Sequence, residues 1–114
     1  SDVCSSDLWG SYQVLHTTDA AQVKEISVNA GARLSYQTHQ KRAEHWFIVK
    51  GPAIVTIDGV TKTLQQGDSI DIGIGVAHRM AAPTENSVVF IEVQTGTYFG
   101  EDDIVRLEDD FGRN

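Results

Sequence analysis

Three side chains of metal-binding type lie close together in the first half of the sequence. Gln37, His39 and Glu44 follow the spacing Gln-x-His-x4-Glu within a segment framed by Gly31 and Gly51. Side chains at positions i and i+2 of a β-strand point to the same face, so Gln37 and His39 converge without special geometry. The four residues after His39 allow the chain to turn and to bring Glu44 back from the next strand. The spacing therefore predicts a metal site.

A fourth candidate ligand, His78, follows a second segment framed by glycines. The segment reads Gly67-x5-Gly73-x-Gly75-x2-His78, which predicts a strand, a tight turn and a returning strand that begins near the histidine. Two imidazoles, a carboxylate and an amide oxygen suit one divalent ion, zinc first, with iron, manganese, nickel or cobalt as alternatives. The expected ligands of this ion are Gln37, His39, Glu44 and His78.

The alternative is that these residues serve only the fold. A single His-x4-Glu pair in a β-protein is more often a surface pair or a hydrogen-bonded pair than a ligand set. Here both glycine-framed segments occur in the order that a shared site needs, and every expected position carries a side chain of ligand type. The combination favours metal binding.

Strand alternation separates the ligands from their neighbours in the chain. Glu44 and Trp46 are expected to share one face, which directs His45 to the other face. His45 is a candidate catalytic proton shuttle because of its position beside a ligand, although alternation favours a structural role. The same alternation applies to Arg79, which follows His78 directly.

Basic residues beside the ligands are candidates for binding an anionic substrate, because they make the local field positive. Arg33 shares the strand parity of Gln37 and His39 and is expected in the pocket, with a buried structural ion pair as the alternative. Lys41 lies in the loop after His39, where a solvated surface lysine is the alternative. We assign Arg33, Lys41 and Arg79 to substrate binding.

Glu92 and Gln94 stand at alternate positions of the apolar run VVFIEVQ, so they are expected to share one face of a strand. On the inner face, Gln94 would contact the substrate and Glu92 would act as a catalytic base. An outward, solvated pair is the alternative.

Between Trp9 and Gln94, short apolar segments alternate with residues that favour turns, such as glycine, proline, asparagine and aspartate. This spacing predicts an all-β sandwich or barrel. Asp58-Gly59 predicts a hairpin, because the glycine supplies the positive φ that a tight turn needs. An early strand is expected to place Val23 and Ile26 among its apolar contacts.

The two ends of the sequence differ in character. Residues 1–8 are small and polar without periodicity, as in a disordered or foreign leader, so we place a single domain at residues 9–114. Within it, the acidic C-terminal tail is expected to dock on the barrel with at most one helical turn. Its expected apolar anchors are Ile104, Val105, Leu107 and Phe111.

Composition narrows the class of protein. The 114 residues fit one globular domain with one core, and no apolar run approaches the ~20 residues of a membrane helix. A formal net charge of −7 without a basic stripe argues against nucleic acid as a partner. The lone Cys4 excludes an intrachain disulfide, and the absence of a signal peptide pattern favours the cytoplasm.

Both glycine-framed segments resemble the two motifs of the cupins, G-x5-H-x-H-x3,4-E-x6-G and G-x5-P-x-G-x2-H-x3-N. The first segment departs from its motif only at Gln37, and the second departs at Gly73 and Ala82. The wider sequence resembles the isomerase domain of type II mannose-6-phosphate isomerases, which is often fused behind a mannose-1-phosphate guanylyltransferase. The similar stretches are WGSY, GARLS, RAEHW, GVAHR, IEVQTG and, the most specific, YFGEDDIVRLEDDFGR.

The resemblance implies a cupin jelly-roll β-barrel, also called a double-stranded β-helix, that binds its metal through the four ligands given above. It implies a metal-dependent isomerase that converts mannose 6-phosphate to fructose 6-phosphate, a small-molecule sugar phosphate. Arg42 matches the arginine of the family's R-x-E-H-W motif, so its implied catalytic role is to contact the substrate phosphate or the negative charge of the developing enediolate. We expect a homodimer.

Two other functions stay open from the sequence. One is a cupin dioxygenase that uses iron or nickel, and the other is a sugar-binding cupin without catalysis. The 114 residues contain no glycine-rich nucleotide loop, so we expect no guanylyltransferase activity from this chain.

Overall fold

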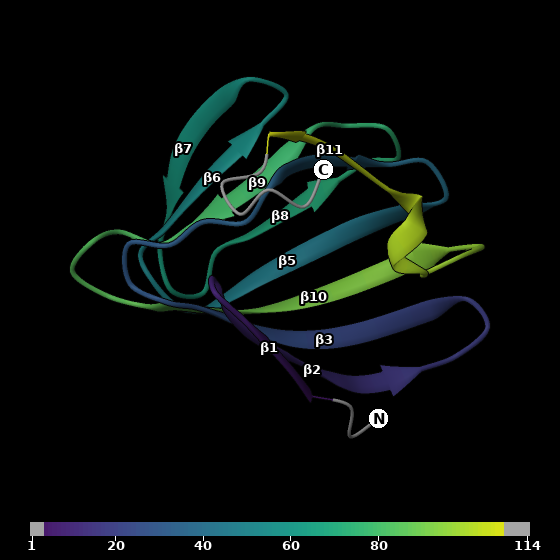
Figure 1. Cartoon of the computed structure of the whole chain (residues 1–114), viewed down its shortest axis with the longest axis horizontal. Coiled ribbons are helices and arrows are strands. Elements are labelled where there is room, and N and C mark those ends of the chain that lie inside the picture. The colour runs from purple at the N-terminus through teal and green to yellow at the C-terminus, as the bar shows by residue number, and fades with distance from the viewer. Residues whose placement is uncertain (1–3, 109–114) are drawn as a thin grey trace.

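The computed structural model describes residues 4–108, which form two antiparallel sheets that face each other (Figure 1). The first sheet contains, in spatial order, β1 (Cys4–Asp7), β2 (Gly10–Thr17), β3 (Ala21–Val28), β10 (Val88–Gly96), β5 (Arg42–Lys50) and β8 (Ser69–Ile72). The second contains β11 (Ile104–Glu108), β4 (Tyr36–His39), β9 (His78–Ala81), β6 (Ala53–Ile57) and β7 (Val60–Leu64). The all-β class predicted from the sequence is confirmed.

The core lies between the sheets and follows strand alternation. Along β5, Glu44, Trp46 and Ile48 are buried, whereas His45 is partly exposed and Phe47 is exposed. Trp46 packs against Phe90 of β10 with ring centroids 5.1 Å apart, and the core continues through apolar residues of both sheets. The alternation expected for β5 is therefore confirmed, and it directs a charged residue, Glu44, into the interior.

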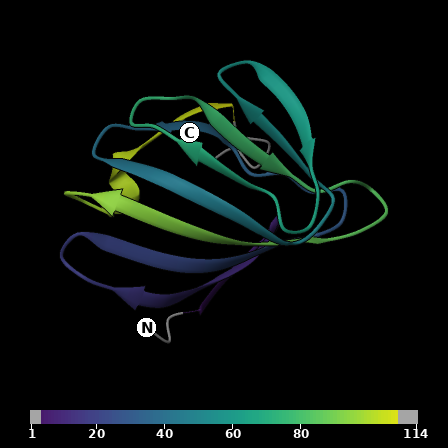
Figure 2. The same ribbon diagram turned by 180° about the vertical axis from the view of Figure 1, so that it is seen from behind.

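The hairpin predicted at Asp58-Gly59 joins β6 and β7 and stands at one corner of the molecule (Figures 1 and 2). Asp58 has φ 49° and Gly59 has φ 83°, so both central residues are in the left-handed region. A two-residue turn with two positive φ angles matches the right-handed twist of the strands that it joins. This hairpin is confirmed with the register Ile57↔Val60.

The structure corrects the N-terminal boundary. Residues 4–7 form β1, which pairs with β2 in the register Cys4↔Gln13 to Asp7↔Gly10, so this part of the expected leader belongs to the sheet. An edge strand is held by backbone hydrogen bonds and does not require apolar side chains. The polar sequence of these residues therefore showed no apolar alternation from which a strand could be predicted. Residues 1–3 lie outside the described residues.

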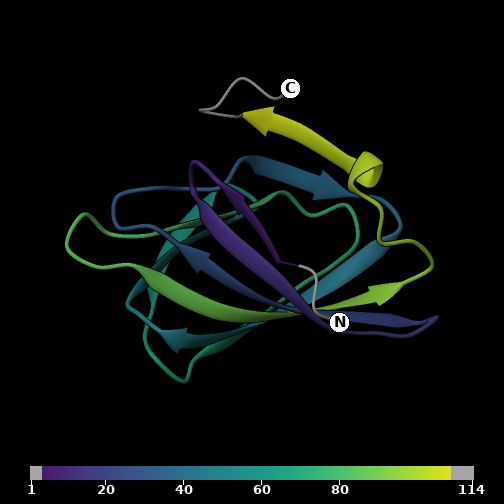
Figure 3. The same ribbon diagram turned by 60° about the horizontal axis from the view of Figure 1, so that its bottom comes forward.

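The structure also corrects the C-terminal segment. The single helical turn is η1 (Glu101–Asp103), but the chain then forms β11, which pairs with β4 at the sheet edge (Figures 1 and 3). Val105 and Leu107 are 50% and 53% exposed, so they are not the buried anchors that the sequence suggested. The segment is docked by strand pairing instead. The predicted anchor Phe111 lies outside the described residues.

The outer face of the first sheet exposes Phe47 and Val49 on β5. The homodimer expected from the sequence stays a prediction.

Within residues 4–108, no helix has the length and apolar character that crossing a membrane requires.

The close approach of β10 to the loop before β5 gives a testable prediction. A Cβ on Gly96 would lie 2.2 Å from the Lys41 carbonyl oxygen and 2.8 Å from the Arg42 Cα, whereas a Cβ on Gly59 would meet no atom within 4 Å. Both glycines have positive φ. We expect Gly59→Ala to cost about 1 kcal/mol and Gly96→Ala roughly 1–3 kcal/mol more in urea denaturation, because only the latter adds a backbone clash. Equal losses would contradict this account.

Candidate metal centre

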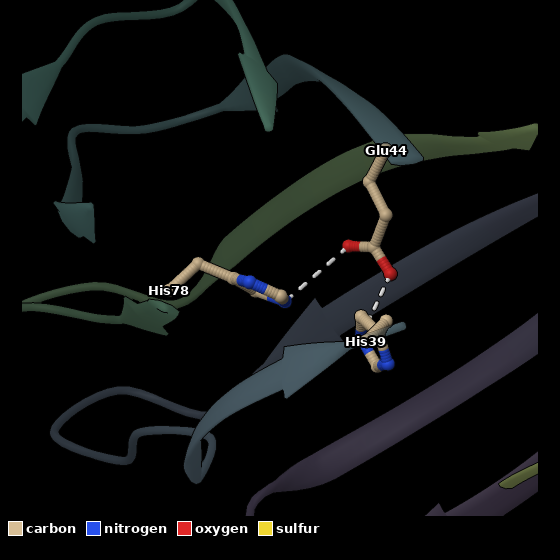
Figure 4. A group of neighbouring side chains, drawn as sticks. All are labelled: His39, Glu44 and His78. Carbon is tan, nitrogen blue, oxygen red and sulfur yellow. Dashed lines mark ion pairs between the residues drawn. The ribbon is translucent and has the colours of Figure 1, made fainter. Parts of the chain in front are cut away.

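Three predicted ligands converge between the sheets from three different strands. His39 is at the end of β4, Glu44 is on β5 and His78 begins β9, and their ligand atoms all lie within 4.8 Å of one another (Figure 4). Glu44 Oε2 lies 3.1 Å from His39 Nε2, and Glu44 Oε1 lies 3.7 Å from His78 Nε2. All three side chains are buried. The carboxylate therefore sits between two imidazoles.

The fourth predicted ligand, Gln37, borders the same pocket. It stands directly opposite His78 in the pairing of β4 with β9, and opposite residues of antiparallel strands present their side chains on one face. Its Nε2 donates to Ser35 Oγ at 2.8 Å. With the amide nitrogen engaged in this way, the amide oxygen is the atom that suits a metal.

The protonation pattern of these residues fits a divalent metal. His78 Nδ1 lies 2.9 Å from the Val76 carbonyl oxygen, which can only accept, so this nitrogen carries the proton and Nε2 carries the lone pair. Burial lowers the pKa of His78, which favours the neutral imidazole that ligation requires. His39 Nδ1 is buried without a hydrogen-bond partner among residues 4–108.

Glu44 is held in its charged form. Burial alone would raise its pKa, but the hydrogen bond with His39 and the charges of His78, His39 and Arg42 together lower the pKa below its usual range. Trp46 Nε1 also donates to Glu44 Oε1 at 2.9 Å, which fixes the orientation of the carboxylate. The group therefore offers a metal one ionised carboxylate that lies between two imidazole rings.

Arg42 contacts the ligands themselves. Its Nε lies 3.2 Å from Glu44 Oε2, its Nη2 lies 3.2 Å from His39 Nε2, and its Nη1 donates to the Phe99 carbonyl oxygen at 3.2 Å. The side chain is 3% exposed. The sequence placed Arg42 in a loop, whereas the structure makes it the first residue of β5, pointing inward beside the predicted ligands.

The pocket around the ligands is rich in positive charge. Four basic residues border it, namely Lys24, Arg42, Arg79 and Arg106, whereas its carboxylates are Glu44 and Glu92. The whole chain carries a formal charge of −7, so this balance is local to the pocket. A cleft with one sign of charge and low-dielectric walls attracts the opposite charge. The pocket therefore suits an anionic ligand.

Glu92 is a buried carboxyl group in this pocket, 6% exposed. Burial first, and then the charge of Glu44, raise its pKa to about 8 against the opposing effects of Lys24, Arg42 and a hydrogen bond from Gln94. Gln94 Nε2 donates that bond to Glu92 Oε1. The expected inward pair is confirmed, but Gln94 is fully buried, does not border the pocket and contacts Glu92, so its position does not support substrate binding.

Other predicted site residues lie away from the ligands. His45 is on the outer face of β5, with its Nδ1 2.6 Å from Asp71 Oδ1, and the side chain is 45% exposed. Strand alternation excludes it from the pocket, so the geometry does not support a catalytic role. Arg33 and Lys41 are exposed outside the pocket, and Lys41 Nζ lies 5.1 Å from the centroid of the Tyr98 ring. These positions do not support their assignment to substrate binding.

Arg79 borders the pocket and also contacts Leu34 and Tyr36. Its Nε donates to the Leu34 carbonyl oxygen at 2.9 Å, and its guanidinium lies 5.9 Å from the centroid of the Tyr36 ring. These contacts link β9 to the chain around β4. They fix the guanidinium within the second sheet.

Two basic residues of the pocket were missed by sequence reasoning. Lys24 is 7% exposed, lies opposite Glu92 in the pairing of β3 with β10, and places its Nζ 4.5 Å from the centroid of the Tyr12 ring. Its signal was strand parity, because Lys24 alternates with the buried Ile26, whereas the expected core residue Val23 is only partly buried. Arg106 was missed because β11 was not predicted.

The ligand assignment gives a test that does not depend on activity. We expect His78→Ala to weaken zinc binding by more than about 100-fold and Gln37→Ala to weaken it less, while both keep the β-rich circular dichroism spectrum. His45→Ala is the matched control, since it removes an imidazole next to Glu44 on the opposite face, and its zinc affinity should stay at the wild-type value. Zinc titration calorimetry measures all three. Unchanged affinity in the first two variants would refute the site.

The raised pKa of Glu92 predicts a pH-dependent stability for metal-free protein. Between its ordinary pKa of 4.5 and about 8, the folded chain holds a proton that the unfolded chain has lost. The free energy of unfolding therefore falls as pH rises across this window, by at most about 1.4 kcal/mol per pH unit from this group. Glu92→Gln should remove that slope in urea denaturation, whereas Glu25→Gln, exposed on the outer face of β3, should retain it.

Comparison with known proteins gives the family. A family model described as "Mannose-6-phosphate isomerase C-terminal" matches residues 5–109. The chain is 50% identical over 105 residues to "Alginate biosynthesis protein AlgA" of Pseudomonas aeruginosa, and 46% identical over 105 residues to "Mannose-1-phosphate guanylyltransferase" of Escherichia coli strain K12. Each match covers 92% of this chain but 22% of the relative, so the chain spans about a fifth of their length.

Solved structures show the same fold. The capsular polysaccharide assembling protein CapF of Staphylococcus aureus superimposes with a TM-score of 0.81 at 19% identity, over 93% of this chain and 34% of that one. An RmlC-like cupin of Shewanella frigidimarina gives a TM-score of 0.72 at 25% identity, over 85% of each chain. The expected cupin jelly roll is confirmed. The chain belongs to the mannose-6-phosphate isomerase C-terminal family and has the cupin fold.

Proposed function

We propose that this chain is a metal-dependent sugar-phosphate isomerase domain that interconverts mannose 6-phosphate and fructose 6-phosphate. The observation that carries the proposal is a buried His39, Glu44 and His78 group that shares a positively charged pocket with Glu92. The matched family is named for mannose-6-phosphate isomerase, and the Escherichia coli relative is named for mannose 1-phosphate. Both names concern phosphorylated mannose.

The metal-binding part of the proposal uses Gln37, His39, Glu44 and His78 as ligands. When bound there, a divalent metal supplies a Lewis acid for the substrate carbonyl. Arg42 adds a fixed positive charge beside two of these ligands, where negative charge develops on the substrate oxygens. The oxygens on C1 and C2 of the open-chain sugar are the groups that this end of the pocket would hold.

Glu92 is the proposed base. Its carboxylate would take the proton from C2 of the aldose and return it to C1, while the hydroxyl proton on O2 moves to O1, so that the sugar keeps its formula. A pKa of about 8 makes both protonation states accessible near neutral pH, which an acid and base in one step requires. Gln94, whose amide donates to Glu92 Oε1, orients the carboxyl group.

The cationic side chains of the pocket suit the phosphate end of the substrate. Phosphate is bound well by arginine, whose planar group donates two parallel hydrogen bonds. An acidic chain that concentrates basic residues around one cleft would draw a dianionic sugar phosphate toward that cleft. A neutral sugar would gain nothing from this arrangement.

An isomerisation assay with a base variant tests the proposal. We expect zinc-loaded wild-type protein to convert mannose 6-phosphate to fructose 6-phosphate, and Glu92→Gln to lower kcat by roughly 100-fold or more with little change in KM. Glu25→Gln is the control for loss of a carboxylate and should keep the wild-type kcat. Metal-loaded protein that binds the sugar phosphate without turnover would instead support a sugar-binding cupin. Oxygen consumption with a diol or thiol would support a dioxygenase.

A further inference from the structure

The C-terminal segment borders the pocket and is attached to the loop that joins the ligand strands. Asp103 in η1 is 9% exposed, and its two carboxylate oxygens accept from the backbone nitrogens of Gln40 at 3.2 Å and Lys41 at 3.0 Å. This loop connects His39 with β5. The side chain of Asp103 therefore ties the start of β11 to the chain segment that carries the candidate ligands.

The pairing of β11 with β4 then determines which side chains face the pocket. Ile104 lies opposite His39 and Arg106 lies opposite Gln37, and both border the pocket, whereas Val105 and Leu107 are exposed. Opposite residues in antiparallel strands share a face. Arg106 is thus placed on the same face as the predicted ligand Gln37, on the edge strand of the sheet (Figures 1 and 3).

The other cationic groups of the pocket, Lys24, Arg42 and Arg79, are at most 9% exposed and contact groups inside the protein. All three nitrogens of the Arg42 guanidinium contact Glu44, His39 or Phe99. Arg79 holds the Leu34 carbonyl oxygen. Lys24 is deeper, opposite Glu92 and against an aromatic ring. Arg106 differs because it is only half-buried on an edge strand, where a ligand entering the pocket can reach it.

We propose that Arg106 binds the phosphate of the substrate, and that Asp103 and β11 form a strap that positions it over the pocket. This inference rests on the proposed function for the identity of the substrate, but its physical content is recognition of a phosphoryl anion. A guanidinium offers phosphate two parallel charge-assisted hydrogen bonds. The strap thereby separates the reacting end of the sugar, near Glu44 and Glu92, from its charged end.

The test is calorimetric binding of mannose 6-phosphate, inorganic phosphate and mannose to zinc-loaded protein. We expect Arg106→Gln to weaken mannose 6-phosphate and inorganic phosphate by about 10-fold to 100-fold, with zinc content and mannose binding unchanged. Lys62→Gln is the charge-matched control, because Lys62 is exposed on β7 away from the pocket, and its affinities should stay within about twofold of wild type. Arg106→Lys keeps the positive charge but cannot donate two parallel hydrogen bonds, so its affinity for mannose 6-phosphate should lie between those of wild type and Arg106→Gln.

Equal affinity of Arg106→Gln and Lys62→Gln for mannose 6-phosphate would overturn the inference. A parallel loss of mannose binding would also overturn it, since that result indicates general damage to the pocket. The proposed function fails separately if wild-type protein binds mannose 6-phosphate through Arg106 and does not isomerise it. In turn, an active wild-type enzyme whose KM is unchanged by Arg106→Gln leaves the isomerase standing and removes Arg106 from the phosphate site.

Discussion

The buried carboxylate of Glu44 is the constraint on which the site depends. An ionised carboxylate inside a protein is very costly unless hydrogen bonds and opposite charges surround it. Glu44 receives them from residues on either side of the interior, including His39 on β4, Arg42 and Trp46 on β5 and His78 on β9. Both sheets must therefore pack in one register for this charge to be tolerated. The same arrangement that stabilises the charge gathers the candidate metal ligands.

Much of this site could be predicted because strand geometry is simple. Alternation along β5 predicted that Glu44 and Trp46 point inward and His45 outward, and the structure has this arrangement. The failures occurred where backbone pairing, which leaves no periodic pattern in the sequence, decided the structure. Edge strands such as β1 and β11 are held by main-chain hydrogen bonds. The polar sequence of β1 and the acidic sequence around β11 therefore lacked the apolar alternation from which a strand is predicted.

Long-range pairing also explains why sequence reasoning chose cations that do not line the pocket. Arg33 and Lys41 are close to the ligands along the chain, yet both are exposed outside the pocket. Lys24 and Arg106 are distant along the chain but are brought to the pocket by strand pairing: β3 pairs with β10, which carries Glu92, and β11 pairs with β4, which carries Gln37 and His39. Proximity in sequence is a poor guide to a pocket whose walls are built from non-local strand pairs. The register of those pairs is set by turns and core packing throughout the domain.

The burial of Glu92 favours catalysis over a passive sugar-binding role. A carboxyl group with a pKa near 8 reduces stability at neutral pH and above, because burial and the charge of Glu44 both oppose its ionisation. Glutamine at this position would bind a sugar hydroxyl with similar geometry and without that loss. Holding a sugar does not by itself require a second buried carboxyl group in the pocket that contains Glu44. A proton-transfer step does provide a reason for it, since it needs a group that both accepts and releases a proton near neutral pH.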